Sequence, residues 1–264
     1  MGSGRLRRIA AVATNTYRET VRERVLYNLV FFALLMTVSG LILRDLAVRQ
    51  DDRIIKDLGF AAMDVFGTLI AIFIGVGLVS KEIERRSLYP LLASPLTRGE
   101  FLMGKLSGLA FTLLVNLGVM TVGLYLTLLA IRMRGALAAP PDARLLAAVA
   151  AIYAGLVLVL AVALLFSTLT SSTMAAVCTF AVVVVGRYAD VIRNVREVVP
   201  GVPSWLTDLV YYALPNFAYL DLKDRVVHGE SVPLATLVWI VAYSFAYSAV
   251  LLGLAAAAFR RKDL

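Results

Sequence analysis

Long runs of apolar residues, separated by short polar stretches, dominate the chain. A helix that crosses a membrane needs about 20 mostly apolar residues, because the hydrocarbon layer is about 30 Å thick and a helix rises about 1.5 Å per residue. Six segments fit this pattern, which predicts an all-α integral membrane protein. The predicted transmembrane helices are Val25–Leu43, Ala61–Val79, Leu106–Ile131, Leu145–Phe166, Thr173–Tyr188 and Leu234–Phe259.

The composition supports a membrane protein. Of the 264 residues, 60% are hydrophobic and 17% are charged, whereas a soluble domain is about 45–50% apolar and about 25% charged. The chain has a single cysteine, Cys178, so an internal disulfide is excluded. It also has a single histidine, His228, and these two side chains are too few for a structural zinc site. The connecting segments are too short for a second core, so residues 1–264 are expected to form a single transmembrane domain.

The distribution of basic residues predicts the orientation. Six spans place both ends of the chain on the same side of the membrane. The segments on that side hold fourteen of the 26 Lys and Arg residues, and five of the other twelve lie in the long outer loop over 187–233, where basic residues count less. Since basic residues favour the cytoplasmic side, we expect an N-in, C-in topology in the cytoplasmic (inner) cell membrane.

Residues 1–24 precede the first predicted span and have an amphipathic pattern. Ile9, Ala13, Tyr17 and Val21 recur at four-residue spacing, and the charged side chains fall elsewhere on the helical wheel. The pattern predicts a basic interface helix in the headgroup plane. The alternative interpretation is a solvated, positively charged tail.

Residues 80–105 are expected to form a cytoplasmic element between the second and third spans. Thr97 and Glu100 make a capping box, so a helix of about 34 residues should begin at Thr97 and extend beyond the membrane. Pro90 and Pro95 limit what precedes it to a short charged helix over 81–89 and a turn over 90–96. This protruding segment is either a docking element for a soluble partner or a solvated charged loop.

The same region contains a sequence that is similar to a phosphate-binding loop. Gly99 to Lys105 has the spacing G-x-x-x-x-G-K, but the Ser or Thr that would hold magnesium is absent. The stretch also follows a helix cap instead of a strand. We therefore expect this chain to bind no cofactor and a separate subunit to bind ATP and magnesium.

The segment from Glu82 to Lys105 resembles the permease subunits of ABC transporters of the ABC-2 (type V exporter) class. The similarity includes the acidic start, a leucine pair, a Ser-Pro, an Arg, and the Glu-Phe and Gly-Lys pairs before the third span. Leu214-Pro-Asn-Phe217 and the charged C-terminal segment resemble the branch linked to multicopper-enzyme maturation and gliding motility. One departure is Arg86-Ser87, where the family commonly has Gly-Thr.

The resemblance implies a six-span half-transporter that forms a homodimer, or a heterodimer with a related permease. It also implies that a separate ATP-binding subunit binds the segment over 82–92 and drives export. No catalytic residue is therefore expected in this chain. The residues implied in ATPase coupling are Glu82, Glu84, Arg85, Arg86, Leu88, Tyr89, Leu91 and Leu92.

Polar residues inside the predicted spans are candidates for a substrate path, because ionisable groups at membrane depth are costly and usually functional. Asp64, Thr68 and Asn116 are the candidates. Arg187 and Asp190 close the fifth span. The competing interpretation of the charged residues is that they lie at the outer interface, where they reach water or pair locally, and that of the uncharged ones is helix packing.

Residues 190–232 form the longest predicted outer loop, rich in proline and aromatic residues. This composition favours short interfacial helices, from about Ser204 to Ala213. The loop either gates release or anchors the protein in the outer interface.

Two other functional classes compete with a transport subunit. An intramembrane enzyme would need a zinc motif, paired aspartates or a serine–histidine pair in the bilayer, and none of these is evident in the sequence. A membrane anchor or assembly scaffold without a transport path remains the main alternative. No sequence feature identifies the substrate.

Overall fold

The computed structural model describes residues 2–22, 51–84, 98–133, 144–193, 203, 208 and 211–261. Within these residues the chain forms helices and turns, and no strand. The helices are α1 (Gly2–Arg22), α3 (Asp51–Glu84), α5 (Arg98–Met133), α6 (Leu145–Leu169), α7 (Ser172–Arg187), α8 (Ala189–Arg193), the 3-10 helix η1 (Ala218–Leu220), α11 (Lys223–Val227) and α12 (Leu234–Arg261).

Four of the described helices are long and apolar enough to cross a membrane. Their candidate spans cover residues 53–77, 99–130, 145–169 and 234–258. Helix α7 is apolar but has only 16 residues, and the predicted first span, Val25–Leu43, lies outside the described residues. The all-helical multi-pass membrane architecture is thus confirmed, whereas the count of six spans and the N-in orientation stay predictions.

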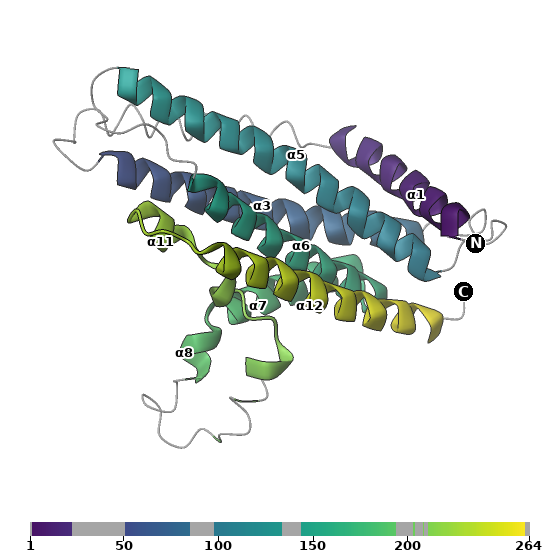
Figure 1. Cartoon of the computed structure of the whole chain (residues 1–264). Helices are drawn as coiled ribbons and strands as arrows, with labels where there is room; N and C mark the ends of the chain where they lie inside the picture. Colours follow the sequence, from purple (N-terminus) through teal and green to yellow (C-terminus); the bar gives the residue numbers. More distant parts are fainter. Residues whose placement is uncertain are drawn as a thin grey trace.

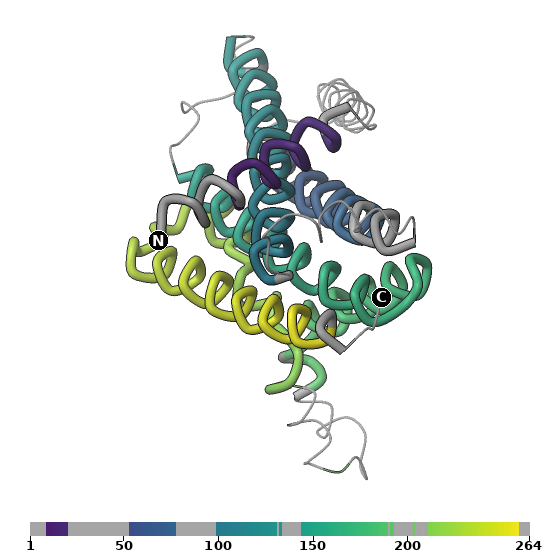
Figure 2. Tube along the Cα trace, turned by 90° about the vertical axis from the view of Figure 1, so that its right-hand side faces the viewer, coloured from purple at the N-terminus to yellow at the C-terminus, as the bar shows by residue number. Residues whose placement is uncertain are grey.

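Helix α6 forms the centre of the bundle, and most of its side chains are buried. It packs against α3, α5, α7 and α12 (Figures 1 and 2). Tyr153 in α6 donates its hydroxyl hydrogen to the Ala110 carbonyl oxygen of α5 at 3.1 Å, and Ser244 of α12 donates to the Ala154 carbonyl oxygen. Gly75 of α3 lets the two backbones approach, since a Cβ there would lie 2.9 Å from the Ala163 Cβ.

Helix α3 is longer than the predicted second span at both ends. It begins at Asp51, ten residues before Ala61, because the apolar repeat continues through Ile55 and Phe60, which are both buried. At its other end α3 continues to Glu84, since no proline or glycine interrupts the chain there. Residues 81–84 therefore belong to α3. The predicted separate short helix over 81–89 is wrong at its beginning, because α3 continues through these residues. Residues 85–97 lie outside the described part.

Helix α5 confirms the prediction of a helix longer than the membrane. It spans 36 residues from Arg98 to Met133, which corresponds to about 54 Å. The Thr97 cap itself lies outside the described residues. Phe101 and Leu102, near the beginning of α5, pack against Ala255 near the end of α12. The two helices therefore run in opposite directions.

Helix α1 packs against the first third of α5 (Figures 1 and 2). A Cβ on Gly104 would lie 2.7 Å from the Val12 Cβ, and one on Gly108 would lie 2.6 Å from the Ala13 carbonyl oxygen. The Tyr17 ring meets the Phe111 ring edge to face at 5.0 Å. The predicted amphipathic helix is therefore present, but the described part of its apolar face covers α5. Its position in the headgroup plane stays a prediction.

Candidate functional site

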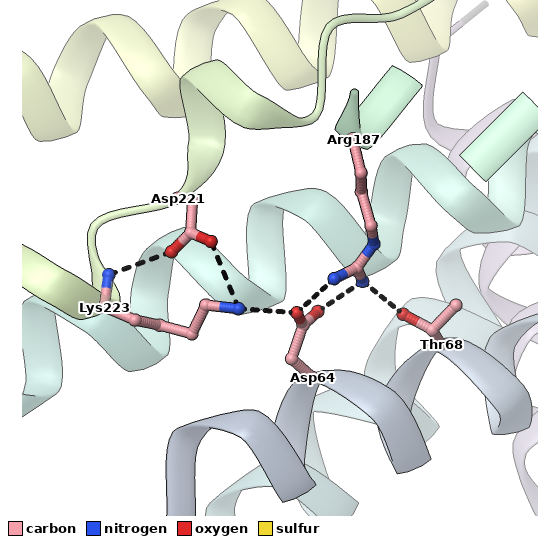
Figure 3. A network of polar contacts seen from close by, with 5 residues as sticks. All are labelled: Asp64, Thr68, Arg187, Asp221 and Lys223. Carbon is pink, nitrogen blue, oxygen red and sulfur yellow. Dashed lines mark hydrogen bonds and ion pairs between the residues drawn. The ribbon is translucent and has the colours of Figure 1, made fainter. Parts of the chain in front are cut away.

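A cluster of charged side chains lies where α3, α7 and the segment after η1 meet (Figure 3). Asp64 of α3 is at its centre. The Arg187 guanidinium, at the end of α7, donates to both carboxylate oxygens of Asp64 at 2.5 and 2.7 Å. The Lys223 ammonium, at the beginning of α11, donates to the same carboxylate at 2.8 Å. One carboxylate thus joins three segments that are far apart in the sequence.

Two further residues complete the cluster. Arg187 also donates to the Thr68 hydroxyl oxygen at 3.1 Å, one helical turn after Asp64. The Lys223 ammonium lies 3.2 Å from a carboxylate oxygen of Asp221, and the Lys223 backbone N–H donates to the other oxygen at 3.0 Å. Lys223 therefore bridges two carboxylates, and Arg187 is held from two positions on α3.

Helix α7 is short, and the segment around Phe217 packs onto its end. Sixteen residues span about 24 Å, less than the hydrocarbon thickness of about 30 Å. The segment around Phe217 packs onto the end of α7, where its backbone N–H donates to the Gly186 carbonyl oxygen at 3.0 Å. Gly186 permits this contact because it has no side chain: a Cβ would lie 2.6 Å from the Phe217 Cδ2 and closer still to the Pro215 carbonyl oxygen.

Tyrosines of α12 hold the same segment from its other side. The Asn216 backbone N–H donates to the Tyr243 hydroxyl oxygen at 3.0 Å, and the Tyr247 hydroxyl donates to the Ala213 carbonyl oxygen at 2.9 Å. The Asn216 side-chain oxygen accepts the Tyr219 N–H at 3.1 Å, which closes the turn into η1. The Leu214-Pro-Asn-Phe217 motif thus fixes the turn that carries Asp221 and Lys223 toward Asp64.

A substitution at Gly186 tests this anchoring. Gly186→Ala is expected to destabilise the protein by about 1–3 kcal/mol, because the new Cβ must displace Pro215 and Phe217. The measurement is the melting temperature of the purified protein in detergent. Gly253→Ala in α12 is the matched control, since a Cβ at Gly253 meets no atom within 4 Å. Equal melting temperatures of the two variants would contradict the close contact.

The four charged side chains of the cluster balance one another. Asp64 and Lys223 are the inner pair, with 15% and 17% of their side chains exposed. Arg187 and Asp221 are more open, at 33% and 46%. Burial lowers the pKa of Lys223, but the Asp64 and Asp221 carboxylates outweigh it and the pKa lies above its usual value. The ammonium is therefore charged at neutral pH, and the cluster is two ion pairs with no net charge.

The cluster forms one wall of a cavity of about 290 Å³. The other walls are apolar and come mainly from α6 and η1. The cavity is thus charged on one side and hydrophobic on the other, a combination that suits a small ligand with a polar and an apolar part. The apolar residues that line it are Ile152, Gly155, Leu156, Val159, Phe217, Ala218 and Leu220.

Comparison with protein families identifies the class of protein. Residues 10–264 match the family model described as ABC-2 family transporter protein. The chain belongs to this family. A comparison with curated proteins gives no match. As an ABC-2 family member, it is a membrane permease subunit of an ABC transporter, and the family implies pairing with an ABC ATP-binding subunit.

The structure of the permease brings together some of the residues that the sequence singled out. Asp64 and Thr68 lie in the cluster, and Arg187 joins them there. Asn116 does not: it is buried in α5, away from the cavity lining, and its side-chain oxygen has no hydrogen-bond partner among the described residues. Asp190 belongs to α8, but its side chain is outside the described part of the chain. Asp221 and Lys223, which complete the charged cluster, were not among the residues that the sequence singled out.

The residues implied in ATPase coupling lie mostly outside the described part of the permease. Glu82 and Glu84 belong to the last turn of α3. The other six are Arg85, Arg86, Leu88, Tyr89, Leu91 and Leu92, and none of them is described. Their role therefore stays a prediction.

The single cysteine and the single histidine occupy ordinary positions in the permease. Cys178 is half-buried in α7. His228 is exposed after α11, and its Nδ1 lies 2.8 Å from the Asp224 carbonyl oxygen. Among the described residues no three His, Cys, Asp or Glu side chains gather in a way that could hold a metal ion.

Proposed function

We propose that this ABC-2 permease forms, as a dimer, the membrane path of an exporter driven by a separate ATP-binding subunit. The observation that carries the proposal is the unbroken course of α3. Asp64 and Thr68 line the charged cavity on this helix, and Glu82 and Glu84 stand in its last turn. One rigid element thus connects the candidate path with the candidate coupling region.

The distance along α3 supports a mechanical link. From Asp64 to Glu84 the helix extends about 30 Å, which is about the thickness of the hydrocarbon layer. A force that the ATP-binding subunit applies at Glu84 would shift or tilt α3, and Asp64 would move relative to Arg187 and Lys223. Breaking and re-forming these ion pairs is how the permease is proposed to open and close its cavity.

The proposed dimer would cover apolar surface that the single chain leaves open. Helix α12 exposes Val238, Trp239 and Phe245, and α5 exposes Val122 and Leu126. Lipid covers part of such a surface in a membrane protein, and a second permease subunit is proposed to cover the rest. The second subunit is either an identical chain or a related permease.

Co-purification tests the proposed function. We expect the tagged full-length chain to retain an ATP-binding subunit encoded beside it, and the complex to hydrolyse ATP with magnesium. Mass determination of the complex gives the number of permease copies. The alternative, a membrane anchor or scaffold, predicts that the chain purifies without any ATPase, or that the ATPase activity does not change when the permease is absent. Either result would contradict the proposal.

A further inference from the structure

The cavity beside Asp64 offers two charges of opposite sign to a ligand. Asp64 and Lys223 are mostly buried, and the Asp64 carboxylate is already shared between Lys223, at 2.8 Å, and Arg187. Arg187 and Asp221 line the same cavity and keep 33% and 46% of their side chains exposed. The accessible chemistry is therefore a guanidinium from α7 and a carboxylate from the turn before α11, on either side of the inner pair (Figure 3).

The balance of charge selects the kind of ligand. The four side chains sum to zero, so a ligand with one net charge would leave an uncompensated charge in a poorly solvated site, which is costly. A zwitterion brings one charge of each sign. Its anionic group can pair with Arg187, whose planar guanidinium suits a phosphate or carboxylate. Its ammonium can donate to the Asp221 carboxylate.

The apolar side of the cavity indicates that the ligand has a hydrophobic part. Ile152, Leu156 and Val159 of α6 face the cavity together with Leu220 of η1. Gly155 widens this wall, because a Cβ at that position would meet only the Leu220 Cδ1, at 3.9 Å. A volume of about 290 Å³ is at the lower end of ligand pockets, which measure about 300–1,000 Å³. It suits a headgroup and the beginning of a chain.

We propose that this cavity binds a zwitterionic amphiphile, with its phosphate on Arg187, its primary ammonium on Asp221 and its apolar chain along α6. The inference deepens the proposed function by naming a substrate class, and it rests on that function. Binding is measured on the permease alone, whereas coupling is measured on the complex with the ATP-binding subunit. Failure of one is therefore distinguishable from failure of the other.

The test uses the purified full-length chain in a neutral maltoside detergent. Native mass spectrometry measures binding of lysophosphatidylethanolamine and of lysophosphatidylglycerol with the same acyl chain. We expect one saturable lysophosphatidylethanolamine per chain and affinity for the anionic lysolipid that is lower by about tenfold or more. Competition by glycerophosphoethanolamine, which has no chain, tests the role of the apolar part. Weak competition is expected, because the headgroup alone lacks the contacts along α6, whereas competition as strong as that of the lysolipid itself would contradict the role of the chain.

Two variants keep the test independent of folding. Gly155→Leu is expected to fill the cavity without removing a charge, and leucine favours the helix by roughly 1 kcal/mol over glycine. It should weaken lysophosphatidylethanolamine binding by about tenfold or more. Gly118→Leu in α5 is the control, since a Cβ there meets no atom within 4 Å. A charge variant, Lys223→Gln, should also weaken binding, but it breaks the inner ion pair, so its melting temperature is measured as well. Arg225→Gln, exposed on the same short helix, should bind normally.

Two results would overturn the proposal. One is equal affinity for the zwitterionic and the anionic lysolipid, which would indicate non-specific partition into the apolar surface. The other is unchanged binding by a folded Gly155→Leu variant, which would place the bound lysolipid elsewhere on the protein.

Discussion

Asp64→Asn is expected to destabilise the permease by about 3 kcal/mol, because the partners of a buried ion pair then remain unpaired. Asp64 accepts hydrogen bonds from both Arg187 and Lys223, so its loss leaves two cations near a single carboxylate, Asp221. The measurement is the melting temperature or the unfolding free energy in detergent. Asp57→Asn is the matched control, since Asp57 is exposed on α3 two turns earlier.

A second variant identifies charge balance as the cause. Asp64→Asn combined with Lys223→Gln leaves Arg187 and Asp221, one charge of each sign, and should recover part of the lost stability. The double-mutant cycle then gives the coupling between the two residues. If Asp64→Asn is as stable as Asp57→Asn, the cluster does not hold α3, α7 and the segment after η1 together.

Replacing Glu84 with glutamine and Leu91 and Leu92 with alanine is expected to detach the ATP-binding subunit or to uncouple its hydrolysis. Removing anchor side chains from an interface weakens binding by about 2 kcal/mol or more each when they are hot spots. The membrane bundle should stay folded, since all three residues lie at or beyond the end of α3. Co-purification and the ATPase rate of the complex are measured together with the melting temperature.

A control at the opposite end of the bundle makes this result specific. Arg132→Gln and Met133→Ala change two exposed residues at the end of α5, far along the helix from its beginning at Arg98. This variant should keep the ATP-binding subunit and its activity. Full activity and normal complex formation by the triple variant would contradict the coupling role of residues 82–92.

The sequence predicted the long apolar helices well, because each of them coincides with an uninterrupted run of apolar residues. Helix α6 begins at Leu145 and α12 at Leu234, as predicted, and α7 is shifted from the prediction by a single residue. The ends of α3 were harder to place. Hydropathy marks where a helix enters lipid, but α3 continues into polar sequence, where only the absence of helix breakers indicates its extent.

The charged cluster could be predicted only in part. Asp64 and Arg187 stood out because charges within apolar runs are unusual. Their pairing could not be deduced, since 123 residues separate them. Asp221 and Lys223 lie in a segment that also contains Asp224 and Arg225, and in sequence they are ordinary loop charges. The signal that could have identified them is the preceding Pro-Asn-Phe turn, which directs the chain back toward α7.

Helix α1 shows a limit of amphipathic patterns. A stripe of apolar and small residues predicts a partner surface but does not distinguish lipid from protein. Gly104 and Gly108 carried the missing information, because two small residues on one face of α5 permit a close neighbour. The sequence predicted the amphipathic helix, and the fold shows that Val12 and Ala13 occupy the space beside these glycines.

The short helix α7 also has a consequence for the surrounding lipid. Met174, Val177 and Phe180 point away from the bundle and are more than half exposed. Wherever this side meets the bilayer, acyl chains must compress by about 6 Å, and hydrophobic mismatch costs fractions of a kcal/mol per Å. Thin or short-chain bilayers reduce that deformation energy. If α7 is the predicted fifth span, the leaflet is locally depressed beside it, and the path from the lipid headgroups to Arg187 is shorter.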